Sequence, residues 1–212
     1  MIERAQGIIL RTRPFTETSV IVDWLTPELG RISTVAKGAR RAKSPFRGKV
    51  DLFYEAAFSF TRSRRSELHT LAEVILLQTH PGLRRELGYV QQASYASALI
   101  VQTTEKESPV PEIHELFHGF LATLPKRPPQ PRNIFAFELK LLALLGLQPD
   151  LAEARLSPET QNLTGILTNE SWETIAELKP AATHVKQLHG FLHGFLIYHL
   201  EKIPKGRSDL LS

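Results

Sequence analysis

The chain has no cysteine among its 212 residues. Disulfides, thiolate nucleophiles and cysteine-ligated zinc are therefore excluded, and a cytoplasmic location is the simplest expectation. No run of about 18 apolar residues occurs, so no membrane-spanning helix is predicted. The first residues, MIERAQGIILRTRPF, lack the apolar middle and the small-residue cleavage site of a signal peptide.

Acidic residues are too few to balance the basic ones in the first part of the chain. Residues 1–80 contain 13 Lys or Arg against 8 Asp or Glu, whereas residues 81–212 contain 13 against 14. The net charge of +4 therefore belongs to the N-terminal third. Charge placed this unevenly is informative about partners, and it favours a polyanion such as nucleic acid.

Short strands are predicted throughout residues 1–80. Val20, Val22 and Trp24 alternate with their neighbours, and PELG follows them as a turn, which is typical of a hairpin. Five closely spaced strands leave little room for helices and favour a five-stranded OB-fold barrel. The expected strands cover residues 7–12, 19–26, 31–38, 50–61 and 68–79.

The apolar period changes from about 2 to about 3.6 at His80-Pro81-Gly82, which suggests a domain boundary. An all-helical domain is therefore expected over residues 81–212, giving an α+β chain of barrel followed by helices. The segment 134–147 is apolar nearly all round, so it is the expected central helix, while 150–169 is expected to be irregular. The other expected helices cover residues 88–104, 111–124, 171–178 and 181–201.

Catalytic motifs are nearly absent. Neither a P-loop nor a G-x-S-x-G motif occurs, and nothing in the sequence demands an enzyme. His114-Glu115-Leu116-Phe117-His118 matches H-E-x-x-H, the zinc-hydrolase pattern in which both His bind the metal. A third ligand is needed; Glu138, 20 residues downstream, could be proposed, but it lies in the most apolar helix. The favoured interpretation is the polar flank of an amphipathic helix.

His189 and His193 form a second pair at i and i+4. Such a pair can bind a metal together with further ligands, but a helix flank is again the favoured interpretation. No metal and no cofactor are predicted.

The stretch VAKGARRAKSPFRGKVDLF is the strongest functional signal. Its Gly residues allow a backbone to approach a phosphate chain, and Phe46 either stacks on a base or anchors the loop on the barrel. Binding to phosphates would have weak sequence preference and strong salt dependence, and RNA remains an alternative to DNA. The DNA-binding candidates are Lys37, Arg40, Arg41, Lys43, Arg47, Lys49, Arg11 and Arg13, with Arg62, Arg64 and Arg65 as possible extensions.

Several motifs resemble those of the bacterial DNA-repair protein family RecO. They are R-P-x-x-E-T-S (13–19), E-x-G-R (28–31), V-A-K-G-A-R (35–40), K-S-x-x-x-G (43–48), F-E-L-x-L-L-x-x-L-G-L-x-P-D-L (137–151) and H-L-x-K-x-P-K-x-R-S-D-L-L (199–211). The resemblance covers the chain nearly end to end. It implies an OB-fold followed by a helical domain.

The resemblance also implies a function: a non-enzymatic recombination mediator, associated with the nucleoid and monomeric when alone. Such a protein binds single- and double-stranded DNA and anneals complementary strands. It works with RecR, and in some bacteria RecF, contacts the tail of single-stranded DNA-binding protein, and helps to load RecA on coated strands.

Two departures from the family's pattern matter. Many relatives carry four cysteines for a structural zinc after P-D-L, and this chain has none there, so that site is expected to be absent. Some relatives hold the partner's acidic tail with an Arg near F-E-L, and the nearest Arg here is Arg132. A groove beside residues 134–147 is expected for that tail.

Overall fold

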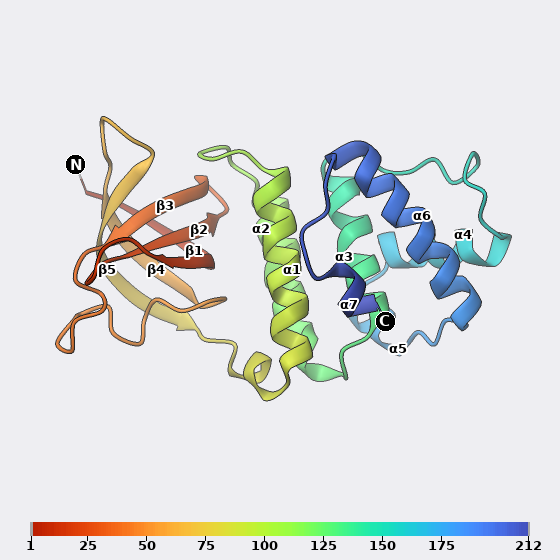
Figure 1. The fold of residues 1–212 in the computed structure, drawn as a ribbon, viewed down its shortest axis with the longest axis horizontal. Coiled ribbons are helices and arrows are strands. Elements are labelled where there is room, and N and C mark those ends of the chain that lie inside the picture. The colour runs from red at the N-terminus through yellow and green to blue at the C-terminus, as the bar shows by residue number, and fades with distance from the viewer. Residues whose placement is uncertain (1, 212) are drawn as a thin grey trace. The chain divides into compact units, whose positions relative to one another are not determined.

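The structure is a computed structural model that describes residues 2–211. The described chain forms two compact units. We call them the barrel unit, residues 2–81 with 103–118, and the helical unit, residues 82–102 with 119–211. The chain passes between them three times, after residues 81, 102 and 118 (the segments can be followed by their colours in Figure 1).

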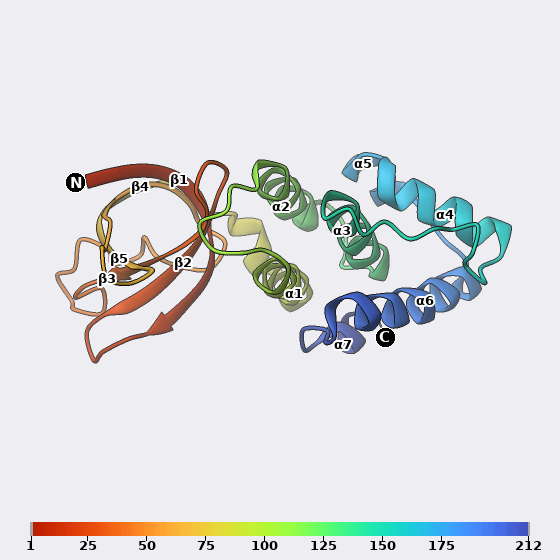
Figure 2. The same ribbon diagram turned by 90° about the horizontal axis from the view of Figure 1, so that it is seen from above.

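Five strands of the barrel unit close on themselves in the order β1-β2-β3-β5-β4, and Figure 2 shows them curling around a common centre. Neighbouring strands are antiparallel except β3 and β5, which pair in parallel. The predicted five-stranded OB-fold barrel is thereby confirmed. The strands are β1 (Ile2–Pro14), β2 (Val20–Thr26), β3 (Gly30–Ala36), β4 (Glu55–Thr61) and β5 (Leu68–Gln78).

The barrel core follows from the alternation of β2. Trp24 is fully buried, stacks on Phe58 with ring centroids 4.0 Å apart, and donates its indole N–H to Thr34 Oγ1 at 2.9 Å. Asp23 faces the other way and accepts a hydrogen bond from Ser33 Oγ at 2.6 Å. Period-2 patterning thus places aromatic side chains inside and a carboxylate outside.

The turn between β2 and β3 requires glycine. Gly30 has φ +66°, and a Cβ at this position would lie 1.8 Å from the carbonyl oxygen of Ser108. Both the backbone conformation and the close approach exclude a side chain. The barrel turn is therefore fitted to the segment that precedes α2.

The regular elements that follow the barrel strands in the described chain are all helices, and α3 is the central one. Phe135, Leu139 and Leu142 of α3 pack with residues of α4, α5 and α6 in one core, as predicted for the segment 134–147. None of the helices within residues 2–211 is both long and apolar enough to cross a membrane. The α-helices are α1 (Leu87–Thr103), α2 (Pro111–Thr123), α3 (Pro131–Leu144), α4 (Pro158–Asn169), α5 (Trp172–Glu177), α6 (Ala182–Leu200) and α7 (Arg207–Leu211). Two 3-10 helices are also present: Pro81–Arg85 before α1, and Leu124–Lys126 between α2 and α3.

Three expectations for local structure were wrong. β4 begins at Glu55 rather than at residue 50, because residues 50–54 lie in turns. α4 occupies residues expected to be irregular, because their polar composition obscured the helix. The N-cap of this helix is Ser157, whose Oγ accepts a hydrogen bond from Thr160 N at 3.3 Å. α7 follows the segment expected to be the last helix. The short helix capped by Ser171, in contrast, is present as predicted, with Thr174 N donating to Ser171 Oγ at 3.2 Å.

Candidate functional site

Residues 37–54 connect β3 to β4 and are called here the basic loop (the orange coil after β3 in Figure 1). Successive turns order its backbone: Arg41 N donates to Gly38 O at 3.0 Å, and Lys49 N donates to Phe46 O at 3.0 Å. Arg40 N donates to Thr18 O at 2.9 Å, which ties the loop to the β1–β2 connection. The backbone of the basic loop is therefore held by hydrogen bonds, both within the loop and to the β1–β2 connection of the barrel unit.

Phe46 anchors this loop. Its side chain is 5 % exposed and belongs to the barrel's apolar core together with Trp24 and Phe58. Of the two roles considered for Phe46, anchoring is the one that this burial supports, because a ring that is already packed in a core presents no face to a base.

The cations of the basic loop face solvent. Lys37, Arg40, Arg41, Lys43 and Arg47 are exposed, and Lys49 is half-buried. Within residues 2–211, none of these six side chains forms an ion pair with a carboxylate. Arg47 donates to Ala42 O at 3.1 Å and Lys49 donates to Val74 O at 3.2 Å, and both of these acceptors are backbone carbonyls and not carboxylates. The loop thus carries positive charge that the protein itself does not neutralise.

The remaining basic candidates of the barrel differ in this respect. Arg11 is exposed on β1, whereas Arg13 lies 3.7 Å from Asp23. Arg62 is held by two carboxylates, donating to Glu3 at 2.7 Å and to Glu107 at 2.7 Å. A guanidinium bonded to two carboxylates offers little net charge to a phosphate. Arg62 therefore does not extend the basic loop's free charge, which the sequence could not reveal.

The H-E-x-x-H segment does not assemble the zinc ligand set that was the alternative to a helix flank. Burial lowers the pKa of His114, Glu115 is exposed, and His118 Nδ1 lies 3.1 Å from Glu55 Oε2. Glu138, the suggested third ligand, is fully buried in the helical unit and accepts two hydrogen bonds from Arg207, at 2.6 and 2.8 Å. A carboxylate committed to a guanidinium in this way is not an available zinc ligand, so the suggested role of Glu138 was wrong.

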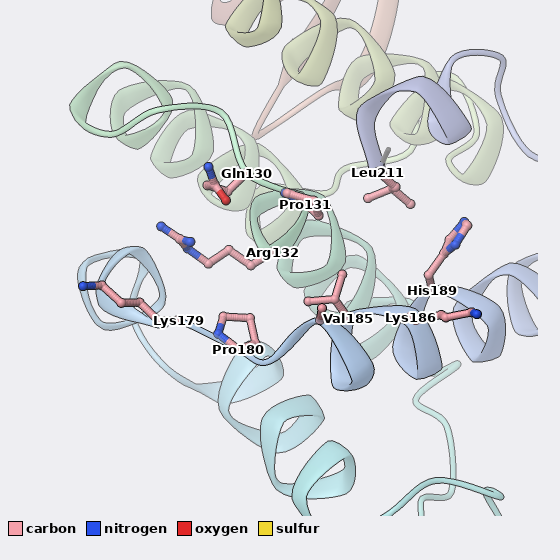
Figure 3. A pocket seen from close by; sticks show the side chains of 10 residues that line it. Gln130, Pro131, Arg132, Lys179, Pro180, Val185, Lys186, His189 and Leu211 are labelled. Carbon is pink, nitrogen blue, oxygen red and sulfur yellow. The ribbon is translucent and has the colours of Figure 1, made fainter.

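A pocket of about 530 Å³ lies in the helical unit, between the N-terminal ends of α3 and α6 (Figure 3). Arg132 and Lys179 extend on one side of it, Lys186 and His189 lie on the other, and Val185 lies between. Arg132 is positioned by a hydrogen bond to Ala176 O at 2.9 Å. The apolar lining comes from Pro131, Pro180, Val185 and Leu211.

This pocket lies beside the first turn of α3, the helix beside which a groove is expected, and Arg132 is among its lining residues. The sequence did not single out Lys179 and Lys186, because each lies more than 45 positions from Arg132 in the chain. His189, from the second His pair, lines the pocket; burial, then the nearby Arg207 and His193, lower its pKa. It is therefore mostly neutral at pH 7.

Comparison with known proteins agrees with this arrangement. Residues 1–80 match the family model "Recombination protein O N terminal", and residues 86–155 match "Recombination protein O C terminal". A DNA repair protein RecO of Rhodopirellula baltica is 33% identical over 143 residues, covering 68% of this chain and 53% of that protein. One of Symbiobacterium thermophilum is 35% identical over 150 residues, covering 69% and 57%.

A cationic loop on a closed OB-fold barrel, followed by helices, defines a class of barrel proteins suited to polyanions. Together with the two matched family models, this arrangement identifies the family. The chain belongs to the RecO family, whose curated members named above are DNA repair proteins. It spans little more than half the length of those relatives.

Proposed function

We propose that this chain is a non-catalytic DNA-binding mediator of recombination and DNA repair. The observation that supports it is the basic loop: six cations on one ordered connection of an OB-fold, none of them neutralised by a carboxylate within residues 2–211. Phosphate contacts from Lys and Arg bind single and double strands alike and carry little sequence information.

Strand annealing follows from the same charges. Two complementary strands repel each other, and cations that hold phosphates from both lower that repulsion while base pairing supplies specificity. Exposed Lys and Arg side chains suit this task, since they can exchange phosphates without enclosing a strand. Mediation with RecR or RecF, and the loading of RecA on coated strands, belong to the same proposal and are supported by family membership.

Annealing of two labelled complementary strands tests this proposal. With the purified chain, in EDTA and without ATP, we expect annealing to accelerate at low salt and to fade as salt rises. If about five phosphates are neutralised on a single strand, log K falls against log salt with a slope of about −3.5. Absence of acceleration at low salt would contradict the proposal, and tighter binding of a matched RNA strand would favour the RNA alternative.

The pocket between α3 and α6 is proposed to receive the tail of single-stranded DNA-binding protein. An acidic, apolar peptide fits its chemistry, because Arg132, Lys179 and Lys186 surround an apolar floor that includes Val185 and Leu211. The cations select carboxylates, while the floor takes an apolar side chain.

Replacing Arg132 by alanine is expected to weaken binding of a fluorescent acidic, apolar peptide about 10-fold. This change corresponds to the loss of one charge-assisted hydrogen bond, which contributes about 1.5 kcal/mol. Fluorescence anisotropy measures this change. Lys126→Ala is the matched control, since Lys126 is an exposed cation of the same unit outside the pocket. Equal peptide affinity for wild type and Arg132→Ala would remove the pocket from the proposal, while the annealing experiment would be unaffected.

A further inference from the structure

Two imidazoles and a carboxylate converge at one place in the barrel unit. Glu55 opens β4, His80 follows β5, and His118 lies on α2. One ligand atom from each lies within 4.8 Å of the other two. In the part of the chain that the structure describes, no other three His, Asp or Glu side chains are gathered so closely.

Two of the three side chains are held in place. Glu55 and His80 are buried, at 7% and 5% exposure. Glu55 accepts from Gln6 Nε2 at 3.1 Å through Oε1, which leaves Oε2 directed at His118 Nδ1, also 3.1 Å away. The rings of His80 and His118 meet edge to face with centroids 6.1 Å apart. His118 is half-exposed, so solvent and ions reach the cluster from its side.

The cluster has the donor set and nearly the dimensions of a zinc site. Zinc binds His nitrogen at about 2.0–2.1 Å and carboxylate oxygen at about 2.0–2.2 Å, so tetrahedral ligand atoms stand about 3.4 Å apart. The Glu55–His118 pair already meets that spacing, and the widest separation, at most 4.8 Å, needs to close by about 1 to 1.5 Å. Rotation of the half-exposed His118 side chain can supply most of that movement.

We infer that Glu55, His80 and His118 form a binding site for a divalent transition-metal ion, zinc foremost, that clamps α2 to the barrel. Two imidazole ligands disfavour Mg²⁺ and Ca²⁺, which prefer oxygen. The site differs from the H-E-x-x-H pattern, since His118 is shared but His114 and Glu115 are not ligands. It also uses none of the cations of the basic loop.

Zinc binding to the full chain tests the inference directly. After chelator treatment and removal of the chelator, the protein is titrated with Zn²⁺ against a zinc-binding dye, and with Co²⁺ as a visible-absorption probe. We expect one Zn²⁺ per chain, a Co²⁺ spectrum of a low-coordinate site, and a metal-dependent rise in the melting temperature of the barrel unit. His118→Gln should weaken zinc binding by at least about 100-fold. Loss of a residue that only hydrogen-bonds to a metal ligand already costs up to about 100-fold, and His118 is itself a ligand.

Matched variants separate this site from the two His pairs with i and i+4 spacing that the sequence shows. His114→Gln, one turn earlier on α2, and His193→Gln, on α6, should keep zinc affinity within a few-fold of wild type. His80→Gln should lose it as His118→Gln does, and circular dichroism without metal checks that each variant is folded. The inference is overturned if wild type binds no stoichiometric zinc, or if His114→Gln abolishes binding while His80→Gln does not.

Discussion

Replacing Arg40, Arg41 and Lys43 together by alanine is expected to weaken binding of single-stranded DNA about 100-fold at roughly 0.1 M salt. Each phosphate contact on a single strand contributes about 0.7 to the slope of log K against log salt, so three lost contacts remove about two decades at that concentration. The slope itself should become shallower by about 2. Fluorescence anisotropy with a labelled oligonucleotide at four or five salt concentrations measures both quantities.

Stability should be almost unaffected by this triple replacement. The three side chains are exposed and lie outside the barrel core, while the anchor Phe46 is left intact. The backbone bond from Arg40 N to Thr18 O also survives in an alanine variant. Any loss of DNA binding can then be assigned to charge rather than to unfolding, with a thermal melt as the check.

A charge-matched control distinguishes the loop from net charge. Arg155, Lys202 and Lys205 are exposed cations of the helical unit, and their joint replacement by alanine lowers the net charge equally. We expect that control to bind DNA within about 3-fold of wild type, because screening confines charge effects to about 10 Å at 0.1 M salt. Equal losses in the two triple variants would show that the basic loop is not the site.

Local sequence patterns were sufficient for much of the fold. Trp24 and its neighbours alternate cleanly, which predicted the β2–β3 hairpin, and the apolar run of α3 predicted a central helix. α4 was missed because its polar residues hide the short buried stripe of Leu163 and Leu167. Its cap at Ser157 was a usable signal, since Ser-Pro-Glu is typical of a helix start.

Candidate sites could be predicted from the sequence only where their residues are close together in the chain. The basic loop is contiguous in sequence, so its cations were recognisable before their exposure was known. The neutralisation of Arg62 could not be recognised from the sequence, because its partners Glu3 and Glu107 lie 59 and 45 positions away. The cluster of Glu55, His80 and His118 was missed for the same reason: it forms only when β4, the end of β5 and α2 come together.

Burial of charge in the helical unit produces the largest stability effect we expect. Arg207 of α7 is 3% exposed and donates two hydrogen bonds to Glu138 of α3, which is fully buried. Tyr95 of α1 donates a further bond to Glu138 at 2.5 Å. Burial, then the Glu138 charge, raise the pKa of Tyr95, so its hydroxyl stays protonated and remains a donor. This network joins three helices that are remote in sequence.

Replacing Arg207 by methionine should lower the free energy of unfolding of the helical unit by about 3–5 kcal/mol, because Glu138 is left as an uncompensated buried charge. Urea unfolding followed by circular dichroism measures the loss, and Lys205→Met, at an exposed neighbouring position, should stay within about 0.5 kcal/mol of wild type. The double variant Glu138→Leu with Arg207→Met should be more stable than Arg207→Met alone, since no charge then remains buried. If the double variant is instead the less stable of the two, the unpaired Glu138 charge does not cause the loss of stability in Arg207→Met. The loss then comes from weaker packing of α7 on α3.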